Sequence, residues 1–89
     1  MREFSARQLE RHLASTDSDP LLLDVREPWE FQICHLDGSQ LIPMGQLANA
    51  LPALDPERET VVICHHGIRS RQVARYLDYQ GFRSVINLS

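Results

Sequence analysis

Cys64 is the residue of this chain best suited to nucleophilic chemistry, because it ends a short apolar run. Val61-Val62-Ile63 precede it, and His65-His66-Gly67-Ile68-Arg69-Ser70 lead from it into a helical pattern. Where a buried strand turns into a helix in this way, backbone N–H groups of the turn point inward and the helix N-terminus adds partial positive charge. Both effects favour the thiolate, which is the nucleophilic form of cysteine. The segment therefore predicts an enzyme.

The residues after the cysteine each have an expected role. Gly67 is expected to take a positive φ, which lets the loop close on itself. Arg69 adds a permanent cation, either to bind substrate or to cap the helix through an ion pair. Ser70 is the helix N-cap or a hydrogen-bond donor to the loop. His65 and His66 are expected to line the pocket, with a general-base role as the alternative.

Four apolar segments predict the strands of a sheet, and helical patterns separate them. Leu21 to Val25 is continuously apolar except for Asp24, which is typical of a parallel strand covered on both faces. The other predicted strands are 41–42, 60–64 and 84–88, and the predicted helices are 5–14, 28–31, 45–54 and 70–80. This alternation predicts an α/β fold with a small, mainly parallel, twisted sheet and helices on both faces. Ligands bind beyond the carboxyl ends of such strands, where Cys64 falls.

Local signals set the ends of two of these helices. Ser5 is a plausible N-cap with Gln8 as its capping-box partner. Ser15 to Pro20 has turn-forming composition, which ends that helix. Gly81 is expected to end the helix that follows the cysteine loop.

Composition and charge exclude several classes of function. The 89 residues have a net charge of −3, which disfavours nucleic acid as a ligand because phosphates need a basic face. No apolar stretch approaches the roughly 18 residues of a membrane helix, and no secretory signal is seen. All nine basic residues are arginine, so a lysine Schiff base is excluded. We expect one soluble, reduced, cytoplasmic domain over residues 1–89.

Two motifs in the expected order make the chain similar to the rhodanese-like sulfurtransferase family. The first is Asp24-Val25-Arg26-Glu27-Pro28 with Glu30-Phe31, continued by His35, Gly38 and Ile42-Pro43. The second is the loop from Cys64 to Ser70, in which the arginine follows the cysteine by five residues. The resemblance spans nearly the whole chain and implies the rhodanese-like fold. Asp24 and Arg26 follow a buried strand, and we expect them to fix the neighbouring loops through an ion pair, with substrate contact as the alternative.

The resemblance implies a double displacement without a bound cofactor. Cys64 takes the outer sulfur of a small anionic donor such as thiosulfate, and the N–H groups from His65 to Ser70 hold the resulting persulfide. Cyanide, a thiol or a protein then accepts the sulfur. Only four residues separate Cys64 from Arg69, one fewer than in phosphatases of related architecture. The shorter loop suits bound sulfur better than phosphate, so a cysteine phosphatase or arsenate reductase is disfavoured.

The sequence leaves several alternatives open. A sulfur-relay module with a partner protein as acceptor is the main rival, and a silent binding domain is disfavoured because Cys64 is present. Cys34 stands where the family commonly has a small residue, and is either a bystander or a resolving thiol. A metal is not expected, since zinc on Cys34, His35, Cys64 and His65 lacks a standard ligand spacing. Members of the family usually continue past the position of Ser89 into a final helix, so either the sequence is truncated there or a partner subunit takes the place of that helix. We expect a monomer or weak dimer.

Overall fold

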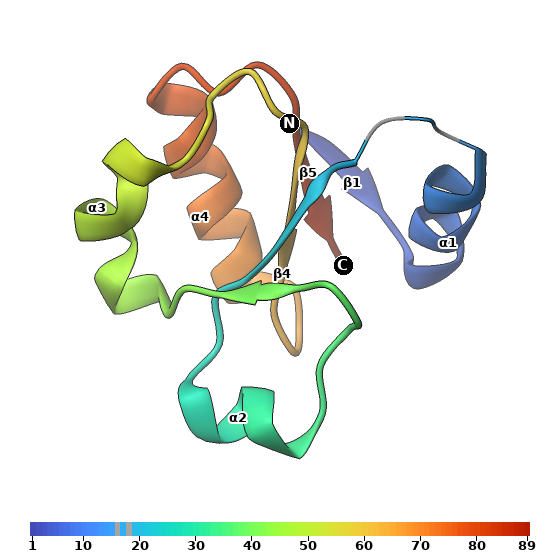
Figure 1. The fold of residues 1–89 in the computed structure, drawn as a ribbon, viewed down its shortest axis with the longest axis horizontal. Helices are drawn as coiled ribbons and strands as arrows, with labels where there is room; N and C mark the ends of the chain where they lie inside the picture. Colours follow the sequence, from blue (N-terminus) through green and yellow to red (C-terminus); the bar gives the residue numbers. More distant parts are fainter. Residues whose placement is uncertain (16, 18) are drawn as a thin grey trace.

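Five parallel strands form one sheet in the order β1-β5-β4-β2-β3, with helices packed against it (Figure 1). The computed structural model describes residues 1–15, 17 and 19–89. The strands are β1 (Arg2–Phe4), β2 (Leu21–Asp24), β3 (Gln40–Leu41), β4 (Thr60–Ile63) and β5 (Val85–Leu88). The helices are α1 (Ala6–Ser15), α2 (Pro28–Ile33), α3 (Leu47–Ala50) and α4 (Ile68–Tyr79), with 3-10 turns η1 (Met44–Gln46) and η2 (Leu51–Ala53) flanking α3. The predicted α/β fold with a parallel sheet is confirmed.

The sequence analysis missed the edge strand β1. Arg2 is in register with Ile86 of β5, and Phe4 with Leu88. Arg2 and Glu3 are exposed and Phe4 is partly buried, so no apolar run marks this strand. Pairing with the carboxyl-terminal strand of the sheet, which sequence patterns do not show, is what makes the segment extended.

Helices cover both faces of the sheet, as predicted (Figure 1). On one face, Leu9 of α1 belongs to a buried cluster whose other members come from the strands: Leu22, Val61, Ile63 and Ile86. On the other face, α3 and α4 pack over the strands through Leu47, Val73, Ala74 and Leu77. Successive side chains of a strand point to opposite faces, so Leu21, Leu22 and Leu23 of β2 are all apolar because each face has its own cover. Burying one such side chain fully stabilises the fold by about 1.5–3 kcal/mol.

The helix-end signals read from the sequence are present in the structure. The backbone N–H of Ser5 donates to Oε1 of Gln8 at 2.8 Å, and the N–H of Gln8 donates to Oγ of Ser5 at 3.2 Å. This reciprocal pair is the predicted capping box. After α4, Gly81 has φ of 93°, and the N–H of Phe82 donates to the carbonyl of Leu77 at 3.0 Å.

Helix α1 ends at Ser15, where the predicted turn begins. Residues 16 and 18 of that turn lie outside the described residues. In the part of the chain that the structure describes, no helix has the length and apolar character needed to cross a membrane.

The carboxyl ends of β2 and β4 lie side by side and position the cysteine loop. Asp24 of β2 is in register with Ile63 of β4, and the N–H of Val25 donates to the carbonyl of Ile63 at 3.0 Å. Cys64 therefore leaves the sheet next to Val25, at the edge beyond which α2 lies (Figure 1). This is the edge at which parallel α/β sheets bind ligands.

Candidate active site

Hydrogen-bond donors of its own loop surround the sulfur of Cys64. The N–H of Gly67 donates to Sγ at 3.0 Å, and the N–H of Ser70 donates at 3.3 Å. Oγ of Ser70 also lies 3.3 Å from Sγ. The thiol donates to this hydroxyl, whereas the hydroxyl donates to the sulfur once the proton has left. Cys64 is partly exposed and lines an open cleft, so the site combines hydrogen-bond donors with access from solvent.

These contacts explain the acidity of the thiol. Burial raises the pKa of Cys64, but hydrogen bonds from the Ser70 hydroxyl and from the N–H groups of Ser70, Gly67 and His66 lower it further than burial raises it. The net pKa lies below the ordinary value of a cysteine. Because these donors favour the charged form, a larger fraction of Cys64 is thiolate at neutral pH than in a free cysteine.

Helix α4 begins two residues earlier than the sequence predicted, which gives Ser70 a different place. Gly67 is the N-cap and Ile68 the first helical residue, so the prediction of Ser70 as N-cap is wrong. Ser70 lies in the first turn, where backbone N–H groups lack a partner within the helix. Its N–H and hydroxyl are therefore free to bind the sulfur, and its side chain is fully buried.

Gly67 makes the tight turn possible. Its φ of 81° confirms the predicted positive value. A Cβ at this position would lie 3.3 Å from Cα of Ser89, so both the conformation and the space favour glycine.

Arg69 is held by Glu30 of α2. Nη1 of Arg69 donates to Oε1 of Glu30 at 2.7 Å, and Nη2 donates to Oε2 at 2.9 Å. The hydrogen bonds from Arg69, together with the N–H of Glu27, hold the pKa of Glu30 at about 2. The ion-pair alternative for Arg69 is thus the one that the structure contains.

Sequence reasoning assigned no role to Glu30, although the residue belongs to the first motif. A local signal exists, because Glu30 is also the capping-box partner of Glu27 at the start of α2. That signal explains the helix start but does not reveal the contact with a loop 39 residues away.

Asp24 and Arg26 form the predicted ion pair at the base of the site. Nε of Arg26 donates to Oδ1 of Asp24 at 3.0 Å, and Nη2 donates to Oδ2 at 2.8 Å. The two side chains are 1% and 9% exposed, so the pair is buried. Nη2 of Arg26 also donates to the carbonyl of Cys34 at 2.7 Å, which fixes the end of α2.

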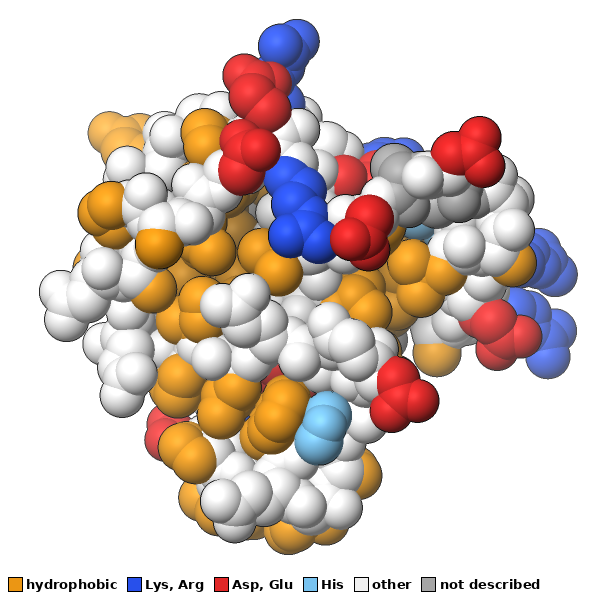
Figure 2. All heavy atoms as spheres, in the orientation of Figure 1, with side chains coloured by type: hydrophobic (Ala, Val, Ile, Leu, Met, Phe, Trp, Pro, Cys, Tyr) orange, Lys and Arg blue, Asp and Glu red, His pale blue; other side chains and the backbone are white. Residues whose placement is uncertain are grey.

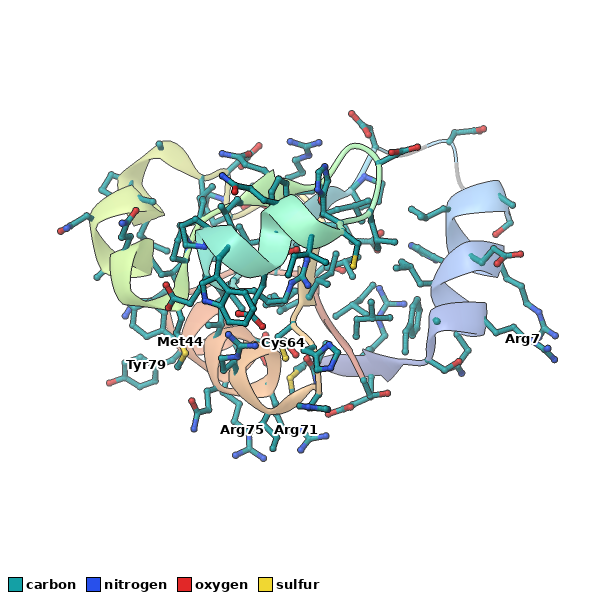
Figure 3. All side chains as sticks on the ribbon, turned by 90° about the horizontal axis from the view of Figure 1, so that it is seen from below. Arg7, Met44, Cys64, Arg71, Arg75 and Tyr79 are labelled. Carbon is teal, nitrogen blue, oxygen red and sulfur yellow. The ribbon has the colours of Figure 1, made fainter. Side chains whose placement is uncertain are left out.

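Two open clefts flank the loop. One, of about 320 Å³, is lined by Asp24, Arg26, Cys34, His35, Leu36, Ile63, Cys64, His65 and Leu88. The other, of about 230 Å³, is lined by Arg26, Trp29, Glu30, Ile33, Cys34 and His65. His65 lines both clefts, as predicted for one of the histidines, whereas His66 and Ile68 line neither; all three residues are exposed. Figure 3 places Cys64 beside α2 at the start of α4, with Arg71 and Arg75 pointing away from it.

The rim of this region carries apolar side chains. Trp29 and Ile33 of α2 and Ile68 of the loop are 65%, 73% and 63% exposed. Figure 2 shows apolar side chains gathered over the part of the surface that α2 forms. Within residues 1–15, 17 and 19–89, no three His, Cys, Asp or Glu side chains are grouped so that they could hold a metal ion.

Comparison with known proteins found a family profile and several relatives that match the chain. The profile of the family described as rhodanese-like domain matches residues 5–89. The thiosulfate sulfurtransferase GlpE of Pseudomonas fluorescens is 32% identical over 88 residues, which are 99% of this chain and 81% of that protein. The putative sulfur carrier protein YrkF of Bacillus subtilis is 40% identical over 82 residues, which are 90% of this chain. The chain spans only 24% and 44% of the length of two curated relatives that it matches.

Solved structures share the fold over the full length of the chain. The crystal structure of a rhodanese-like domain protein from Staphylococcus aureus superposes with a TM-score of 0.90, covering 100% of this chain and 85% of that one. Its sequence identity is 24%, so this likeness concerns the fold.

Proposed function

Because this chain belongs to the rhodanese-like domain family, we propose that it is a sulfurtransferase that moves sulfur from an anionic donor to a thiophilic acceptor through a persulfide on Cys64. One observation carries the proposal: the backbone N–H groups of Gly67 and Ser70 and the Ser70 hydroxyl converge on Sγ of Cys64. Such donors stabilise a thiolate before the reaction and an anionic persulfide after it.

In the first step, the Cys64 thiolate attacks the outer sulfur of thiosulfate. A bond forms between Sγ and that sulfur, the sulfur–sulfur bond of the donor breaks, and sulfite leaves with the electron pair. The outer sulfur then carries the negative charge of the Cys64 persulfide. The loop donors from His65 to Ser70 are positioned to stabilise this charge, and no cofactor takes part.

In the second step, a nucleophilic acceptor attacks the outer sulfur of the persulfide. With cyanide the products are thiocyanate and the Cys64 thiolate, so charge and atoms balance and the enzyme returns to its starting state. A lowered pKa also makes Cys64 a good leaving group, because the leaving thiolate is stabilised by the same hydrogen bonds.

Arg69 contributes as a cation held in a fixed place. The Arg69 side chain is 35% exposed even though it is paired with Glu30. We place it as a binding residue for the anionic donor, while Asp24 and Arg26 support the loop from the end of β2. The proposed unit is one domain over residues 1–89, a monomer or weak dimer, in a reducing compartment such as the cytoplasm.

Intact mass spectrometry tests the proposal. Incubation with thiosulfate, followed by removal of the donor, is expected to add one sulfur atom of about 32 Da to the protein, and cyanide is expected to remove it. A Cys64→Ser variant should gain no sulfur, and its circular dichroism spectrum controls for folding. Equal sulfur uptake by this variant would refute the assignment of Cys64.

The exposed apolar rim favours a second candidate function, in which the acceptor is a partner protein. Trp29 and Ile33 stand next to the cleft yet are largely exposed, as expected for side chains that become buried on contact with a protein. Replacing both by alanine should slow sulfur transfer to reduced serum albumin several-fold more than transfer to cyanide. Tyr79→Ala is the matched control, because Tyr79 is 89% exposed at the far end of α4. Equal effects on both acceptors would contradict the protein-acceptor function.

A further inference from the structure

A second thiol shares the cleft with the reactive cysteine. Cys34 follows the last residue of α2, is exposed, and lines the same open cleft of about 320 Å³ as Cys64, together with Arg26 and His65. Cys34 also lines the neighbouring cleft under the apolar rim of α2. Cys34 therefore belongs both to the cleft that contains Cys64 and to the cleft that contains the exposed Trp29 and Ile33.

The structure holds Cys34 in place at this point. Its N–H donates to the carbonyl of Glu30 at 3.3 Å, and its own carbonyl accepts from Nη2 of Arg26 at 2.7 Å. Arg26 is in turn fixed by the buried Asp24. The hydrogen bonds to Asp24 are the main reason that the pKa of Arg26 is raised, and Cys34 adds to the effect. Arg26 and Cys34 also line the same two clefts.

We propose that Cys34 is a sulfur-relay residue, which takes the sulfur from the Cys64 persulfide and presents it at the surface. This inference rests on the proposed function. The Cys34 thiolate attacks the outer sulfur of the Cys64 persulfide, a sulfur–sulfur bond forms at Cys34, and the bond to Sγ of Cys64 breaks. Cys64 leaves as a thiolate and Cys34 becomes the persulfide. No oxidant or reductant is needed, because one sulfur–sulfur bond replaces another.

The surroundings of the two sulfurs give the relay a direction. The thiolate released at Cys64 is received by the hydrogen bonds from Gly67 and Ser70, which favours its departure. Arg26 lines the same cleft as the two thiols, and its ion pair with Asp24 holds its guanidinium in place there. The sulfur ends on an exposed side chain, where a bulky acceptor has better access than at the partly buried Cys64.

Peptide mapping after thiosulfate treatment tests the relay. The chain has no lysine, so trypsin separates Cys34, in residues 27–58, from Cys64, in residues 59–69. The protein is loaded with thiosulfate, freed of donor by gel filtration, sampled over time, alkylated and digested. Sulfur is expected first on 59–69 and then on 27–58, with the sum constant. The rate should not change on tenfold dilution of the protein, because the transfer is intramolecular.

Every other result of the peptide mapping would overturn the relay through Cys34. Sulfur that stays on 59–69 overturns the relay and leaves the proposed function intact, whereas no sulfur on either peptide overturns both. Labelling of Cys34 in the Cys64→Ser variant shows direct reaction with the donor and overturns the relay. A rate proportional to protein concentration also overturns it, since the transfer would then occur between molecules.

A variant in which the thiol of residue 34 is moved to position 32 is the matched control for the relay. Gln32 lies two residues before Cys34, is exposed and lines neither cleft. The double variant Cys34→Ser, Gln32→Cys keeps an exposed thiol on α2 but moves it out of the cleft. It should receive less than a tenth of the sulfur that Cys34 receives; equal labelling would overturn the relay, because position in the cleft would then not matter.

Discussion

Glu30 and Arg69, 39 residues apart in the chain, form a bidentate ion pair with N–O distances of 2.7 and 2.9 Å. The pair joins α2 to the loop that follows β4. The cation of the loop is therefore fixed relative to Cys64 by a residue from another element. In this pair the planar guanidinium of Arg69 faces the carboxylate of Glu30 with two parallel hydrogen bonds, a geometry that a lysine could not reproduce.

Replacing Arg69 by alanine is expected to slow persulfide formation about tenfold, which corresponds to about 1.4 kcal/mol. The reason is the loss of a positive charge near the incoming anionic donor. Rates of sulfur uptake from thiosulfate measure this. Glu30→Gln keeps the positive charge of Arg69 and removes only its anionic partner, so this variant should slow sulfur uptake less than Arg69→Ala does. If the two variants are equally slow, Arg69 acts only by tying the loop to α2.

The stability from this ion pair should depend on pH in one direction. The pKa of Glu30 is about 2 in the folded protein, below the unfolded value of about 4.3. The pair therefore stabilises the fold fully above the unfolded pKa, and this stabilisation is lost as the pH falls through about 2. The difference in Tm between the protein and Glu30→Gln should be largest near pH 6 and should shrink between roughly pH 4 and 2. Calorimetry measures it.

Glu57→Gln is the control for that experiment. Glu57 forms a 3.4 Å ion pair with Arg83 in which both side chains are more than half exposed, at 65% and 73%. Such pairs contribute little, so the variant should have nearly the same Tm as the protein at every pH. If Glu30→Gln changed the Tm as little as Glu57→Gln does at every pH, the prediction for the ion pair of Glu30 and Arg69 would be contradicted.

Ser70→Ala is expected to raise the pKa of Cys64, because it removes the hydroxyl that donates to the thiolate. The midpoint of the alkylation rate against pH should move up by roughly half to one pH unit, the equivalent of one lost hydrogen bond. The measurement uses iodoacetamide in a Cys34→Ser background, so that only Cys64 reacts. Ser39→Ala, which affects a hydroxyl bonded to Leu36 outside the loop, should leave the midpoint where it was. An unshifted midpoint in Ser70→Ala would mean that the backbone N–H groups alone set the acidity.

Gly67→Ala should destabilise the fold by about 1–2 kcal/mol, since alanine at a positive φ is strained. A Cβ would also lie 3.3 Å from Cα of Ser89, which adds steric cost. Urea unfolding gives the free energy. Gly81→Ala has the same kind of φ but open space around the Cβ, so it should cost less. Gly45→Ala has neither problem and should be nearly neutral, and an equal loss in all three variants would remove the steric argument.

The buried pair of Asp24 and Arg26 should show strong coupling. Arg26→Met leaves a carboxylate buried without its partner and is expected to cost about 3 kcal/mol. The double variant Asp24→Asn, Arg26→Met should lose less than the sum of the two single variants, because no unpaired charge remains. Arg58→Met, which breaks an exposed pair with Asp19, should cost about 0.5 kcal/mol or less. Additive losses at positions 24 and 26 would show that the two side chains act independently.

Much of the fold was predictable from the sequence because its signals are local. The apolar runs of β2 and β4 predict strands buried on both faces, and alternation with helices then fixes parallel pairing. The capping box of Ser5 and Gln8 and the positive φ of Gly67 each depend on residues close in the chain. The short strand β1 escaped prediction because only its contact with β5 makes it a strand.

For the site, the sequence alone predicted Cys64 as the candidate nucleophile, the loop donors and the pairing of Asp24 with Arg26, since all of these depend on residues close together in the chain. Only the tertiary structure decided that Glu30 holds Arg69, that α4 begins early enough to turn Ser70 onto the sulfur, and that Cys34 shares a cleft with Cys64. The physical reason is that these contacts depend on how α2 lies against the loop after β4, an arrangement set by packing at the end of the sheet and by no pattern within either segment.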